Sequence, residues 1–190
     1  MTILGAPVIK DNAQNSAEQN EIDDLNRATK CFKFLHAHDA LVILKNSLAT
    51  PKLLYLLRTS ECADNPLLRK FNDTLAAALT TVLNVSLSDD QWLQASLPVG
   101  DGGLGIQSTQ MLAPSAFLAS AASTLQLQQS IFPDSISALS DQSAEATEAL
   151  WIGLANSPTP AVEVQHIQKA WDKQFATNHQ ALIFSRAPCE

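Results

Sequence analysis

The chain has no lysine or arginine between residues 71 and 168, a stretch that carries nine acidic residues. Residues 1–70 hold nine of the twelve basic residues against eight acids, so the net charge of −7 comes from the middle of the chain. Negative charge repels phosphate backbones, so contact with nucleic acid is expected only from the N-terminal third. The alternative is that the acids simply solvate the outer faces of helices.

Cysteine, glycine and long apolar runs are also scarce. The three cysteines, Cys31, Cys62 and Cys189, are widely spaced, which argues against a disulfide framework or a paired-cysteine metal motif. Six glycines and a single tyrosine argue against an all-β sandwich. No uninterrupted apolar run reaches membrane-spanning length, and the N-terminus lacks the basic flank of a signal peptide. We therefore expect an intracellular protein with reduced thiols and no membrane partner.

The residues that are present favour helices around a packed core. Hydrophobic residues make up 46% of the chain and charged residues 16%, which suits a folded chain rather than a disordered one. The expected fold class is all-α: an irregular helical bundle with a short extended N-terminal segment and one Gly-rich loop at 97–106. Apolar residues at helical spacing predict helices near residues 17–36, 39–48, 52–58, 66–83, 88–94, 111–127, 141–154 and 162–182.

Local start signals support several of these helices. Ser16 with Gln19 is typical of a capping box, Asp39 and Ser88 are candidate caps, and Pro66 suits a first helical turn. Pro114 is expected in the first turn of its helix. The last helix is expected to bury one stripe, made of Val164, Ile167, Trp171 and Phe175. Residues 130–140, around Pro133, are predicted to be a linker.

The loop from Gly100 to Gly105 is the first candidate for chemistry. Its glycines suggest a phosphate cradle, but the loop lacks the lysine ending of a P-loop and the spacing of a dinucleotide-binding motif. No lysine is expected beside it. A structural turn that allows close backbone packing is therefore the favoured interpretation.

Other candidate groups do not form a recognisable site in the sequence. His36, His38 and Asp39 lack a fourth metal ligand, and a helix corner is favoured. The carboxylate pairs Asp23-Asp24 and Asp89-Asp90 are better explained as caps and solvated faces than as metal ligands. No base accompanies a cysteine, and the tryptophans are expected in the core rather than stacked on bases. No catalytic residue, metal or cofactor is predicted.

Several phrases nevertheless resemble a known family. LGAPV at Leu4 to Val8, the segment from His38 to Ser60, and the segment SDDQWLQASLPVGDGGLGIQSTQMLAPSAFLASAA from Ser88 to Ala122 are similar to the region that follows the catalytic palm in reverse transcriptases of non-LTR retroelements. The resemblance covers roughly residues 3–125. It implies a division into a thumb- or connector-like region at 1–125 and a C-terminal helical extension at 126–190.

The resemblance also implies a function. The chain would be a C-terminal fragment of an RNA-directed DNA polymerase, helping the full-length parent to hold template–primer. The family's YxDD-type catalytic motif is absent, because Tyr55 is followed by Leu-Leu-Arg, so we expect no polymerisation by this chain alone. A helical protein–protein interaction module with no nucleic-acid role is the alternative. The expected phosphate contacts are Lys30, Lys33, Lys45, Lys52, Arg58, Arg69 and Lys70, with Lys30 and Lys33 on one helix face.

Overall fold

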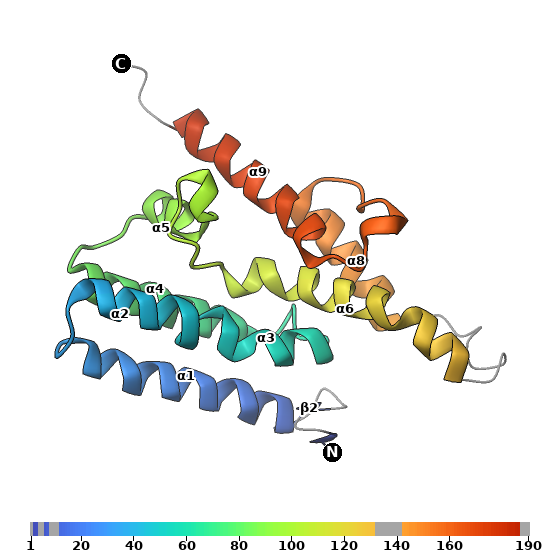
Figure 1. Ribbon diagram of the computed structural model, residues 1–190, viewed down its shortest axis with the longest axis horizontal. Coiled ribbons are helices and arrows are strands. Elements are labelled where there is room, and N and C mark those ends of the chain that lie inside the picture. The colour runs from blue at the N-terminus through green and yellow to red at the C-terminus, as the bar shows by residue number, and fades with distance from the viewer. Residues whose placement is uncertain (1, 4–5, 8–11, 132–141, 187–190) are drawn as a thin grey trace.

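A computed structural model describes residues 2–3, 6–7, 12–131 and 142–186. Helices make up most of this part of the chain (Figure 1), so the predicted all-α class is confirmed. In the short extended segment, β1 (Thr2–Ile3) pairs antiparallel with β2 (Ala6–Pro7). The α-helices, in chain order, are α1 (Asn12–Phe32), α2 (Ala37–Ile43), α3 (Thr50–Thr59), α4 (Pro66–Leu83), α5 (Asp89–Ser96), α6 (Thr109–Ile131), α8 (Gln142–Ala155) and α9 (Gln168–Arg186).

The N-terminal helices pack around one hydrophobic core. α1 lies along α4, while α2, the π-helix η1 (Leu44–Leu48) and α3 follow one another as a rod beside them (Figure 1). The apolar spacing that predicts a helix near residues 66–83 appears in α4 as a stripe of buried side chains, Leu68, Phe71, Leu75 and Leu79. Positions three and four residues apart share a helix face, so this spacing points the stripe at the neighbouring helices.

α6 connects this core to a second, smaller one. Leu112, Ala113 and Ala116 of α6 belong to the first core, whereas Leu118 and Ala119 belong to the second. The second core is completed by Trp151 and Ala155 of α8 and by Trp171 and Phe175 of α9. The division predicted at residue 125 falls within α6 and stays a prediction.

Two helix starts form as the sequence predicts. Asn65 precedes α4, and its side-chain Oδ1 accepts a hydrogen bond from the Leu67 amide at 3.0 Å. Ser88 precedes α5 in a reciprocal capping box, in which Ser88 Oγ accepts from the Gln91 amide at 3.3 Å and Gln91 Oε1 accepts from the Ser88 amide at 2.9 Å. Both satisfy helix-terminal amides that have no partner within the helix.

Three other start predictions are wrong. α1 begins at Asn12, so Ser16 lies inside the helix rather than at its cap, and the helix ends at Phe32 instead of residue 36. His36 occupies the cap position of α2, with Asp39 in the first turn. α6 begins at Thr109, which puts the buried Pro114 in its second turn. Local signals fail here because packing extends helices beyond the nearest capping residue.

The last predicted helix is interrupted. A 3₁₀ turn, η3 (Val162–Val164), precedes α9, and α9 begins only at Gln168. Trp171 and Phe175 are buried as predicted, but Val164 and Ile167 are 36% and 44% exposed. The expected stripe is therefore half as long as predicted. The predicted linker lies mostly outside the described residues, apart from Ser130 and Ile131, which belong to α6.

The rod from Ala37 to Thr59 is long and apolar enough to cross a membrane, because a stretch of 18 residues within it has a mean hydropathy of 1.3, and 33% of that shorter stretch is buried. This corrects the expectation that no such run exists, which considered only uninterrupted apolar residues. Leu44, Leu53 and Leu57 of the rod are fully buried in the first hydrophobic core. The absence of a membrane partner stays a prediction.

Candidate functional site

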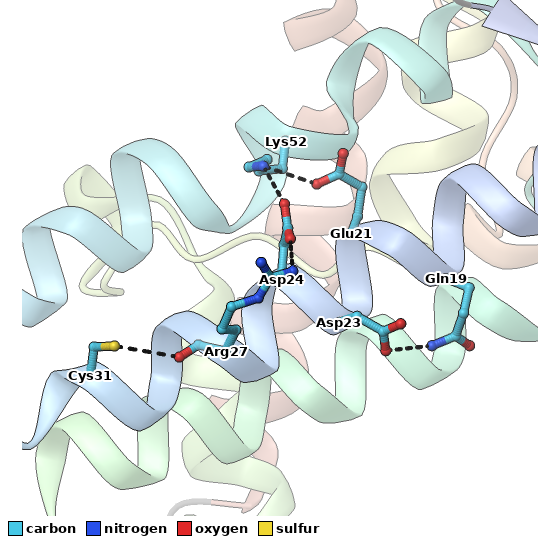
Figure 2. Close-up of polar contacts among 7 residues, drawn as sticks. All are labelled: Gln19, Glu21, Asp23, Asp24, Arg27, Cys31 and Lys52. Carbon is cyan, nitrogen blue, oxygen red and sulfur yellow. Dashed lines mark hydrogen bonds and ion pairs between the residues drawn. The ribbon is translucent and has the colours of Figure 1, made fainter.

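Lys52, on α3, is one of the expected phosphate contacts. Its Nζ lies 3.3 Å from Glu21 Oε2 and 3.2 Å from Asp24 Oδ2, both on α1 (Figure 2). Hydrogen bonding to Asp24, followed by that to Glu21, raises the pKa of Lys52. Two carboxylates already neutralise the Lys52 ammonium. A phosphate that binds Lys52 would therefore have to displace these carboxylates or share the ammonium with them.

The paired carboxylates of the sequence are engaged in surface contacts. Asp24 Oδ1 also lies 2.7 Å from Arg27 Nη2, and Asp23 Oδ1 accepts a hydrogen bond from Gln19 Nε2 at 2.8 Å (Figure 2). Asp90, in the first turn of α5, forms an ion pair with Arg186 near the end of α9. These contacts agree with the interpretation of both pairs as solvated and capping carboxylates.

Two more of the basic residues have amide partners. Lys70 Nζ donates to Gln19 Oε1 at 3.0 Å, and Arg58 Nη2 donates to Gln168 Oε1 at 3.1 Å. Both side chains remain exposed, as does Arg69. A neutral amide compensates a cation less than a carboxylate does, so these residues keep more capacity for an anion than Lys52.

Lys30 and Lys33 are exposed, but they do not share a helix face. α1 ends at Phe32, so Lys33 stands in the turn beyond the helix. Its Nζ lies 4.9 Å from the ring centroid of Phe34, whose side chain is 77% exposed. The sequence argument assumed a helix through residue 36, and the earlier helix end removes the predicted spacing.

Lys30 and Lys70 lie in different places along the pair of helices α1 and α4. Asn65 Nδ2 contacts Asn15 Oδ1, and Lys70 Nζ contacts Gln19 Oε1, which shows that α1 and α4 run parallel. Lys30 follows Gln19 by eleven residues, which is about 16 Å along a helix. The positive charge near Lys70 and that near Lys30 are therefore separate, and nucleic-acid binding by any of these residues stays a prediction.

Most backbone amides of the Gly-rich loop are already hydrogen-bonded to nearby carbonyls. The loop begins with the 3₁₀ turn η2 (Val99–Asp101). The amides of residues 101–106 all donate to carbonyls of residues 95–99. A Cβ on Gly103 would lie 2.1 Å from the Leu97 carbonyl oxygen, so this position requires glycine. A phosphate cradle needs free amides that converge on the anion. The loop is a packing turn, as the sequence favours.

One lysine does lie against this loop, contrary to the sequence expectation. A Cβ on Gly105, where φ is +71°, would lie 2.8 Å from Lys45 Nζ of η1. Lys45 is far from the loop in the sequence, so no local spacing could reveal the contact. Glycine at 105 leaves room for the lysine side chain.

A groove that sequence reasoning missed lies between the loop, α6 and α9. We call it the α9 groove, and its volume is about 870 Å³. Its walls include Leu97, Asp101, Met111, Asp172, Phe175 and His179. Clefts of this size are typical of small-molecule sites.

Asp172 is the most perturbed group in the α9 groove. Burial raises its pKa to about 6, although the Ser115 hydroxyl and the Gln168 side chain oppose the change. Gln168 Nε2 donates to Asp172 Oδ2 at 3.3 Å, whereas the fully buried Ser115 Oγ has no hydrogen bond of normal geometry among the described residues. A perturbed carboxyl in a groove is a candidate binding group.

His179 lies two turns after Asp172 on α9 and also lines the α9 groove. Burial lowers its pKa, so the imidazole is neutral near pH 7. Asp172 is next to Trp171 in the sequence, and His179 lies four residues after Phe175. The neighbouring sequence does not indicate that another helix covers Asp172 and His179. Their burial depends on α5 and α6, which are distant in the chain.

Within the described part of the chain, no group of three or more His, Cys, Asp or Glu side chains gathers at metal-binding distance. Comparisons with models of protein families, with curated proteins and with solved structures find no match. The function is therefore argued from the residues and their geometry.

Proposed function

We propose that this chain is a non-catalytic C-terminal region of a reverse transcriptase-like retroelement protein, which helps to hold template–primer in its full-length parent. The supporting observation is that the two longest segments with the family resemblance pack on each other. α3, which lies within the first segment at residues 38–60, packs against α6, most of which lies within the second segment at residues 88–122. The Gly-rich phrase within the second segment receives Lys45 of the first at Gly105.

The positions of charge define the role of the region in this proposal. Lys52 is neutralised by Glu21 and Asp24, whereas Lys30 and Lys33 are exposed cations with no carboxylate partner among the described residues. Contact with phosphates would fix the position of a duplex without reading its sequence. The region then acts as a helical support with a small basic contact at the end of α1.

A binding titration tests this placement. Fluorescence anisotropy of a labelled RNA–DNA duplex would compare the wild type, Lys30→Glu/Lys33→Glu and the matched control Lys52→Gln at low and high salt. We expect weak, salt-sensitive binding, because cations that contact phosphates release counterions. The double variant should weaken it by about tenfold, since two phosphate contacts become repulsive, while the control changes it little. Binding that ignores the double substitution would contradict the proposal.

Two further observations bear on the parent. Purified chain should extend no primer on any template, because the carboxylate triad of the family is missing. A frame encoding a palm with a YxDD-type motif directly upstream of Met1 in the genome would support the proposal. An isolated start codon behind its own promoter would contradict it.

A helical interaction module is the second candidate. The observation in its favour is the end of α6, where Leu125, Leu127 and Ile131 are 51%, 60% and 66% exposed. Leu127 and Ile131, four residues apart, share one helix face, and neighbouring exposed apolar side chains are a common feature of protein–protein contacts. A chain that binds no duplex even at low salt would favour this function.

A further inference from the structure

We propose that the α9 groove binds a small organic molecule that carries a primary ammonium group on an apolar body. This site is separate from the basic end of α1 and does not depend on the proposed function. The groove encloses about 870 Å³, within the range of about 300–1,000 Å³ that small-molecule sites occupy.

The apolar part of the ligand has a matching wall. Leu97 closes one side from the end of α5, Met111 and Leu112 line the α6 side, and Phe175 lines the α9 side. An aromatic and three aliphatic or thioether side chains favour an apolar ring or chain, because its contact with them removes apolar surface from water.

The carboxylate of Asp172 selects the cation. Asp172 lines the groove and is only partly exposed, and Gln168 Nε2 donates a long hydrogen bond of 3.3 Å to its Oδ2. No lysine or arginine of the described chain lies within ion-pair distance of it. A carboxylate held from water without a counter-ion gains strongly from an ammonium that donates to it.

The other charged groups of the groove act from its rim. Lys169 and Lys173 flank Asp172 on α9 and oppose a cation, whereas Asp101 on the loop attracts one. His179 is neutral near pH 7 because burial lowers its pKa. Lys169, Lys173 and Asp101 are exposed, so water and salt screen them more than Asp172.

Isothermal titration calorimetry of the full chain with three matched probes tests the site. Benzylammonium, benzyl alcohol and benzoate share a ring and differ in charge. We expect benzylammonium to bind one to one with a Kd on the order of 1 mM, and the other two at least about tenfold more weakly. Asp172→Asn should weaken benzylammonium by about tenfold, and Asp101→Asn, the matched rim control, by less than about threefold.

A second measurement on the wild type keeps the test decisive if Asp172→Asn does not fold. Because the pKa of Asp172 is raised to about 6, the carboxylate ionises between about pH 5 and about pH 7. The affinity for benzylammonium should rise about tenfold over that interval, while that for benzyl alcohol stays constant. Equal binding of the neutral probe, tighter binding of benzoate, a flat pH profile or no binding at millimolar concentration would overturn the proposal.

Discussion

The indole rings of Trp151 and Trp171 meet edge to face, with their centroids 5.0 Å apart and their planes at 89°. Phe175 adds a third ring, 5.8 Å from Trp151. Trp171 Nε1 also donates to the Gln165 carbonyl at 2.8 Å, which fixes the turn before α9. These rings join α8 and α9 and form most of the second core.

Trp171→Ala should therefore weaken the C-terminal part of the fold. Removing a large buried ring leaves a cavity and should lower the free energy of unfolding by about 3–5 kcal/mol. Urea unfolding followed by circular dichroism measures the loss, and hydrogen exchange should locate it in α8 and α9. Ile167→Ala is the control, because Ile167 is 44% exposed. A loss no larger than that of the control would show that these rings do not support the fold.

Gly103→Ala should destabilise the Gly-rich loop, because its new Cβ would meet the Leu97 backbone carbonyl. Backbone atoms cannot rotate away, so a cost of about 1–3 kcal/mol is expected. Gly100→Ala is the matched control in the same loop, since nothing lies within 4 Å of its added Cβ. Thermal melts of the two variants give the comparison. Similar melting temperatures would contradict the close packing at Gly103.

Leu75→Asp should unfold much of the N-terminal core. Leu75 is 0% exposed, and an unpaired carboxylate there should cost about 3–5 kcal/mol. Ala77→Asp places the same charge on the exposed side of α4 and should change stability by less than about 0.5 kcal/mol. An unchanged melting temperature of Leu75→Asp would mean that this stripe faces water.

Glu18 makes stability depend on pH. Its side chain is 1% exposed, and burial raises its pKa from 4.5 to about 7. The folded chain therefore holds a proton that the unfolded chain loses, so stability should fall as pH rises from 4.5 to about 7. Glu18→Gln keeps the acceptor for Gln14 Nε2 and removes the titration.

The Glu18→Gln variant should then be more stable than the wild type at about pH 8, by about 2–3 kcal/mol, with a flatter pH profile. Urea unfolding across the pH range measures both. Asp172→Asn is the companion variant. The pKa of Asp172 is raised from 3.8 to about 6, so the loss of stability that its ionisation causes should appear at lower pH than that of Glu18. A Glu18→Gln profile that parallels the wild type would show that another group carries the dependence.

Some features of the candidate sites were readable from the sequence and others were not. The loop was recognised as a turn because four glycines and Pro98 lie within a few residues of one another. The basic residues were found, but their partners were not. Lys52 contacts Asp24 across 28 residues, Lys70 contacts Gln19 across 51, and Arg58 contacts Gln168 across 110. The α9 groove joins segments that no motif links.

The sequence by itself determined the helical class, the apolar spacing of α4 and the helix starts marked by Pro66 and Ser88, because these depend on interactions within about one helical turn. Tertiary structure decided that α1 starts before Ser16, that Lys45 meets Gly105, and that Asp172 lies in a groove. Those outcomes depend on which helices pack together. Burial and ion pairing follow from neighbours in space, and spacing along the chain does not encode them.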